Sequence, residues 1–163
     1  MNGRAAWRRS LKILHELSGI GVGGGFAACL VVGFAADPAS PVAFAASRDI
    51  VAAIARWVLV PSLAVVLVTG LLAIAATRGY HDAGWAWVKA ATGLLLFEAT
   101  LVTVAASSRQ AELASAVAAA ASDPTLVAAL LHSERTTLWV LLGLAVANVV
   151  LAVWRPRLVW KVR

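Results

Sequence analysis

A long apolar stretch near the start of the chain, residues 11–34, constrains the fold more than any other feature. After Lys12, its charged or imidazole side chains are His15 and Glu16. Its 24 residues, at about 1.5 Å of rise each, make about 36 Å of helix, and a bilayer core is roughly 30 Å thick. The stretch therefore predicts a helix that crosses a membrane, with His15 just inside its N-terminal end.

Three further apolar stretches follow, at residues 57–76, 85–106 and 136–154. Together with the first they predict an all-α protein, a four-helix transmembrane bundle that forms one domain over residues 1–163 and contacts the lipid bilayer. The composition agrees, because hydrophobic residues make up 61% of the chain and charged residues only 13%, against roughly 25% in soluble domains. The net charge of +6 does not indicate nucleic-acid binding, because the basic residues cluster at the chain ends beside apolar stretches.

Lysine and arginine residues are divided unevenly between the two sides of the predicted bundle. One side holds 10 of them, namely Arg4, Arg8, Arg9, Lys12, Arg78, Lys89, Arg155, Arg157, Lys161 and Arg163. The other side holds 4, namely Arg48, Arg56, Arg109 and Arg135. By the positive-inside rule, both termini are expected in the cytoplasm.

Helices two to four are expected to extend beyond the outer face. Residues 107–122 are alanine-rich but polar at their start, and Asp123-Pro124 is a typical helix start for a fourth helix that runs to Trp154. Ser47 is a plausible N-cap for the second helix, unless that helix begins earlier. Pro61 predicts a kink or a locally opened turn within it.

His15 and Lys89 each lie about one turn into a predicted span and approach the membrane from the same side. A neutral imidazole can hold a haem iron, and a lysine near the interface can reach a haem propionate while its stem stays in the apolar layer. This pair predicts a haem b site with His15 as the metal ligand. The alternative is a hydrogen-bonded interfacial histidine beside a lysine that extends to the lipid headgroups.

Gly19 and Gly23 follow His15 by four and eight residues, so they share its helix face. A groove along that face could hold a flat cofactor, and close packing of neighbouring helices is the alternative.

Glu98 falls near the middle of the third span, where an ionisable side chain is costly and usually faces the bundle interior. It is a candidate contact to a buried cofactor, a proton relay, or a protonated side chain that joins helices by a hydrogen bond, with Arg56, Asn148, Thr69 and Thr100 as candidate partners. Lys89 and Glu98 are nine residues apart, about 900° of helical rotation, and so are expected on nearly opposite faces. His132, Glu134 and Arg135 are interpreted as part of a solvated helix surface with a local ion pair, and a second external site is the alternative.

Three short motifs resemble a known group of membrane proteins: LKILHEL at residues 11–17 before a glycine-rich helix, WVK at residues 87–89 and RP at residues 155–156. They are similar to the small four-helix bacterial proteins that include the HemJ-type protoporphyrinogen oxidases and the membrane domains of CopD-type copper-resistance proteins. The resemblance implies a bacterial inner-membrane protein with a b-type haem, His15 as its ligand and an important Lys89. Phe97-Glu98 stands where the HemJ-type pattern has Tyr-His, which favours a related uncharacterised family.

Three functions are compatible with these features. The first is a haem b protein of membrane electron transfer or tetrapyrrole oxidation, so whether the chain is an enzyme stays open. The second is a non-enzymatic subunit that assembles a larger membrane complex, as a homo-oligomer or with a partner. The third is a proton-coupled carrier that uses Glu98, which is disfavoured because the four spans contain no visible internal repeat.

Overall fold

The computed structural model describes residues 3–37, 40–81, 83–118 and 124–154, and these residues form helices and no strands. The elements in chain order are α1 (Gly3–Ala35), α2 (Pro41–Ile54), the π-helical turn η1 (Ala55–Leu59), α3 (Val60–Ala76), α4 (Arg78–His81), α5 (Gly84–Ala118) and α6 (Pro124–Trp154). Residues 155 and 156, which carry the RP motif, lie outside the described residues.

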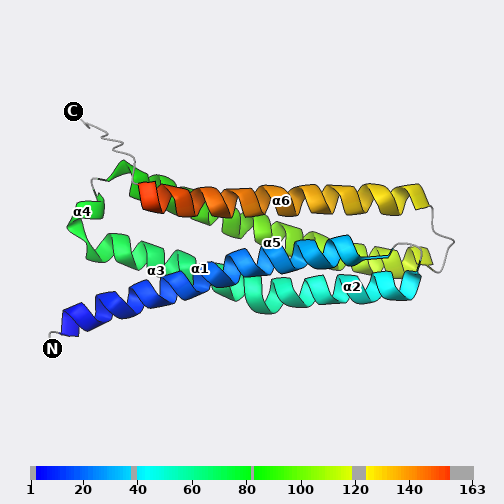
Figure 1. Cartoon of the computed structure of the whole chain (residues 1–163), viewed down its shortest axis with the longest axis horizontal. Coiled ribbons are helices and arrows are strands. Elements are labelled where there is room, and N and C mark those ends of the chain that lie inside the picture. The colour runs from blue at the N-terminus through cyan, green and yellow to red at the C-terminus, as the bar shows by residue number, and fades with distance from the viewer. Residues whose placement is uncertain (1–2, 38–39, 82, 119–123, 155–163) are drawn as a thin grey trace.

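The helices form a bundle of four long rods, because α2, η1 and α3 follow one another as a single bent rod (Figure 1). The rod of α1 packs against α3 and α6, and α5 packs against the same two helices from the other side. The start of α1, the short α4 and the end of α6 lie at one end of the bundle, which we call the α4 end (Figure 1). The opposite end, where α2 and α6 begin, is called the far end.

The second rod begins earlier than one of the two starts considered from the sequence. Ser40 is its N-cap and accepts a hydrogen bond from the Ala43 N–H at 3.4 Å, and Pro41 occupies the first turn. Ser47 is instead a buried residue within α2 that donates to the Phe44 carbonyl at 2.7 Å. An N-cap at Ser47 is therefore wrong.

The opened turn expected near Pro61 is confirmed. Within η1 the hydrogen bonds widen by one residue, so that the Val60 N–H donates to the Ala55 carbonyl. Proline has no N–H to continue the α-helical pattern, and a π-helical turn is one way for a helix to absorb this loss. The turn bends the rod without ending it, which keeps α2 and α3 in one continuous membrane-length element.

Four segments of the described chain are long and apolar enough to cross a membrane, as expected. They are Ala6–Ala35, Val42–Ala76, Gly84–Val104 and His132–Trp154. Compared with the predicted stretches, the second segment begins 15 residues earlier, because α2 joins α3 through η1. The extension of the third and fourth helices also agrees, since α5 continues to Ala118 and α6 starts at Pro124.

The bundle has a small apolar core and an apolar exterior. Phe26 and Cys29 on α1 are fully buried, at 0% and 1% exposure, and pack in a cluster with side chains of the other long helices. Outside this core, large apolar side chains such as Ile20, Val102 and Val153 are mostly exposed. A surface this apolar is typical of helices that face lipid, because lipid chains are as apolar as the core.

Candidate functional site

His15 on α1 turns its imidazole towards α3 inside the bundle. Its Nδ1 lies 2.9 Å from the hydroxyl oxygen of Thr69, a buried residue. Thr69 Oγ1 donates its only hydrogen to the Val65 carbonyl, 2.6 Å away. Since that hydrogen is already used, the hydroxyl accepts a hydrogen bond from His15 Nδ1–H. The imidazole is thus held as the Nδ1–H tautomer, and its Nε2 carries the lone pair.

The Nε2 atom of His15 faces Lys89 on α5, with the Lys89 Nζ 3.5 Å away. An ammonium group can only donate, so this contact also requires an unprotonated Nε2. The structure therefore brings together the two residues that the sequence places at similar depth. Three helices meet at one imidazole: α1 supplies it, α3 orients it and α5 presents a cation to its lone pair.

Asn148 connects the fourth long helix, α6, to the same place. Its side-chain amide donates to the Lys89 carbonyl at 3.2 Å and to the Thr92 hydroxyl at 2.8 Å. We call His15, Thr69, Lys89, Thr92 and Asn148 the His15 cluster. Because these bonds cross between helices, the cluster fixes the rotation and height of all four rods near the α4 end.

The glycines of α1 divide into two groups. Side chains of the second rod pack directly on Gly21 and Gly25, where an added Cβ would lie 2.5 Å from Ser62 Oγ and 2.6 Å from Leu59 Cδ2, respectively. At Gly19 and Gly23, by contrast, an added Cβ would meet no heavy atom within 4 Å. Close helix packing therefore accounts for the first group, and open space borders the two glycines on the His15 face.

Glu98 does not belong to the His15 cluster. It is exposed on α5, whereas Leu96 and Thr100 on either side of it are buried at 4% and 2% exposure. The interior-facing placement expected for Glu98 is wrong, because α5 turns the Lys89 side inward and the two residues lie on opposite faces, as their spacing requires. None of the four candidate partners forms an ion pair or hydrogen bond with Glu98 within the described part of the chain.

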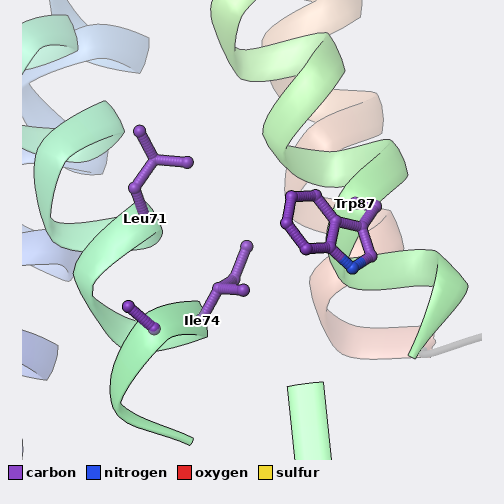
Figure 2. Close-up of a pocket in the computed structure, with 4 residues that line it drawn as sticks. Leu71, Ile74 and Trp87 are labelled. Atoms are coloured by element: carbon purple, nitrogen blue, oxygen red, sulfur yellow. The ribbon is translucent and has the colours of Figure 1, made fainter. Parts of the chain in front are cut away.

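An open apolar cavity of about 400 Å³ lies between α3 and α5 at the α4 end, lined by Leu71, Ile74, Ala75 and Trp87. Figure 2 shows Leu71 and Ile74 on α3 facing the Trp87 ring on α5. Its size falls within the range of small-molecule sites, roughly 300 to 1,000 Å³. A second cavity, of about 220 Å³, is lined by α3 residues that include Thr69, the hydrogen-bond partner of His15.

A second polar cluster lies at the far end and differs from the solvated surface expected there. Glu134 on α6 pairs with Arg48 on α2, and both side chains are mostly buried, at 16% and 15% exposure. The neighbouring Arg135 donates to the Gly33 carbonyl at 2.9 Å and stacks over the Phe34 ring. Sequence reasoning missed this cross-helix ion pair because its members are 86 residues apart and neither belongs to a motif.

No group of three or more His, Cys, Asp or Glu side chains that could hold a metal ion occurs among the described residues. A haem iron needs fewer protein ligands than such a group supplies, and the His15 cluster offers one imidazole nitrogen. Comparison of the chain with protein-family models, with curated proteins and with solved structures finds no match.

Proposed function

We propose that this chain is a haem b-binding integral membrane protein that acts in electron transfer or tetrapyrrole oxidation, with His15 as an axial ligand. The observation that carries the proposal is the contact between His15 Nδ1 and the Thr69 hydroxyl, which already donates to the Val65 carbonyl and therefore assigns the ring proton to Nδ1. Metal-binding histidines are usually held in this way, with one ring nitrogen donating to a neighbour and the other free to bind the metal. The resemblance to the HemJ-type and CopD-type proteins supports the same assignment.

The residues around His15 fit such a ligand. Lys89 Nζ lies 3.5 Å from His15 Nε2, and its flexible stem would let the ammonium turn to meet a haem propionate. Gly19 and Gly23 leave open space on the His15 face for a flat ring. Haem b supplies one-electron redox chemistry when bound, and the apolar helices around it exclude water.

The orientation of the bundle follows from charge. Among the helices that the structure describes, the α4 end carries six lysine and arginine residues of the sequence and the rest of the bundle carries four, and by the positive-inside rule we assign the α4 end to the cytoplasm of a bacterial inner membrane. His15 and Lys89 then lie in the cytoplasmic leaflet, where a propionate can reach the headgroup region. This placement supports electron exchange with a partner on the cytoplasmic side.

An absorption spectrum tests the proposal. Protein purified in mild detergent, with haem added if needed, is expected to show a Soret band that His15→Ala abolishes. His132→Ala is the matched control, because His132 is exposed at the far end of the bundle. Lys89→Met keeps the apolar stem without the charge and is expected to weaken haem binding about tenfold or more. Wild-type protein without a Soret band, or an unchanged band in His15→Ala, would overturn the assignment.

A non-enzymatic role in membrane assembly is a second candidate function. It is favoured by Glu98, which lies on the outer surface of the bundle rather than inside it. An acidic side chain that faces lipid is costly, and contact with another protein removes that cost.

A further inference from the structure

Glu98 lies at the centre of an exposed apolar stripe on α5. Its neighbours on that stripe are Leu94, Leu95, Leu101 and Val102, all exposed. Glu98 makes no hydrogen bond or ion pair with any residue that the structure describes. Because Glu98 lies in the segment Gly84–Val104, which is long and apolar enough to cross a membrane, its carboxyl group would face lipid without a partner in a single chain, which is costly.

The depth of Glu98 follows from the two polar clusters. Lys89 meets His15 at the α4 end, and Gly33, 18 residues after His15, meets Arg135 at the far end. At about 1.5 Å per residue these two layers are about 27 Å apart. Glu98 is nine residues beyond Lys89, or about 14 Å, and therefore lies about halfway between the layers.

Arg56 is the cation that best matches this depth on the surface. It is exposed in η1, with its guanidinium 5.9 Å from the Trp57 ring centre, and lies 13 residues before Thr69. Thr69 is hydrogen-bonded to His15 and so lies at the same depth. Arg56 is therefore about 19 Å closer to the far end than His15, and about 6 Å closer to the far end than Glu98. A long arginine side chain covers such a difference by extending along the helix.

Arg56 and Glu98 also lie on the same side of the bundle. Val58 faces α1, because its Cγ1 is 3.6 Å from the position of a Cβ on Gly25. Arg56, two residues earlier in this π-helical turn, lies roughly on the opposite side of η1 from Val58, and η1 packs against α5 as well as against α1. The helices that carry the two charges pack against each other, yet within the described chain Arg56 and Glu98 do not pair.

We propose that this face, formed by η1, the start of α3 and the exposed stripe of α5, binds a second copy of the same chain. A two-fold axis parallel to the helices places each residue at the same depth in both protomers. Arg56 of one protomer therefore meets Glu98 of the other, and the pairing occurs twice. The apolar residues beside Glu98 then pack across the interface. This dimer does not depend on haem, because the His15 cluster lies on the opposite face of α5.

Disulfide cross-linking tests the geometry in native membranes. Two differently tagged chains are co-expressed, one with Arg56→Cys and the other with Glu98→Cys, and an oxidant is added. We expect a mixed disulfide dimer in several-fold higher yield than when either chain is combined with Val140→Cys. Val140 is the matched control because it is exposed on α6, eight residues from Asn148 and thus at about the depth of Glu98. The wild-type chain is the blank, since its one cysteine, Cys29, is buried.

Mass measurement in mild detergent tests the energetics. The wild-type protein is expected to be a dimer, and Glu98→Gln and Arg56→Gln are each expected to raise its dissociation constant about tenfold or more. The double variant should be little weaker than either single variant, because both remove the same pairs. Glu16→Gln is the control, since Glu16 is exposed and bound to Lys12 of its own chain.

Several outcomes would overturn this proposal. A mixed disulfide yield equal to that of the Val140→Cys control contradicts the interface. A purely intrachain disulfide in a further variant, one chain that carries both Arg56→Cys and Glu98→Cys, contradicts it as well. A wild-type monomer, or cross-linking of Glu98→Cys only to a different protein, contradicts a second copy as the occupant. A wild-type protein without a Soret band would overturn the proposed function and leave the dimer unaffected, so the proposed function and this interface fail separately.

Discussion

Replacement of Thr69 by valine exchanges one hydroxyl group of the His15 cluster for a methyl group of similar size. Thr69 Oγ1 makes two kinds of hydrogen bond: it donates within α3 to the Val65 carbonyl, and it accepts from His15 Nδ1 across the helix interface. Thr100 is an equally buried threonine whose hydroxyl donates only within its own helix, to the Leu96 carbonyl at 2.7 Å. The difference between Thr69→Val and Thr100→Val therefore isolates the bond to His15.

The expected size of this difference is set by the environment of the imidazole. Hydrogen bonds between helices in a membrane contribute on average about 0.6 kcal/mol and at most about 1.7 kcal/mol. A buried donor left without a partner costs about 1 to 3 kcal/mol, and the Nδ1–H of a half-buried His15 would lose its partner. Thr69→Val should therefore be less stable than Thr100→Val by about 1 to 2 kcal/mol, a factor of about 5 to 30 in the unfolding equilibrium.

Unfolding of the detergent-solubilised protein, followed by circular dichroism against increasing denaturant, measures both variants under the same conditions. Haem titration of the same samples adds a second readout, in which Thr69→Val is expected to bind about 10- to 100-fold more weakly and Thr100→Val unchanged. Equal stability of the two variants within about 0.3 kcal/mol would refute the argument that the hydroxyl holds the ring.

Four further variants test the packing of the bundle in the same unfolding assay. Gly25→Ala should destabilise by about 1 to 3 kcal/mol, because its Cβ would lie 2.6 Å from a side-chain carbon of the second rod, whereas Gly24→Ala has no atom within 4 Å and should be neutral or stabilising by up to about 1 kcal/mol. Glu134→Gln should cost about 3 kcal/mol, since it leaves the guanidinium of Arg48 mostly buried without a countercharge. Asn148→Leu should cost about 1 to 2 kcal/mol by removing both bonds from α6 to α5, and a loss below about 0.3 kcal/mol would show that these bonds are not needed.

The similar depth of His15 and Lys89 could be predicted from the sequence, but the hydrogen-bond partner of His15 could not. His15 and Lys89 each lie about one turn into an apolar stretch predicted from the sequence, 11–34 and 85–106, and both stretches start on the same side, so counting residues from the apolar boundary places them at one height. Thr69 enters from the opposite direction at the end of a long rod, and the widened turn at η1 shifts its register. Its contact with His15 therefore depends on a local distortion that Pro61 indicates only in general terms.

What the amino-acid sequence determined by itself is the number and order of the membrane-length helices, because an apolar stretch long enough to cross a bilayer can satisfy its backbone only as a helix. What only the tertiary structure decided is the rotation of each helix about its own axis. A helix in water shows its buried side as an apolar stripe, but in α5 both sides are apolar, since lipid and core have nearly the same polarity. That is why the direction of Glu98, and the pairing of Arg48 with Glu134, emerge only when the four rods pack together.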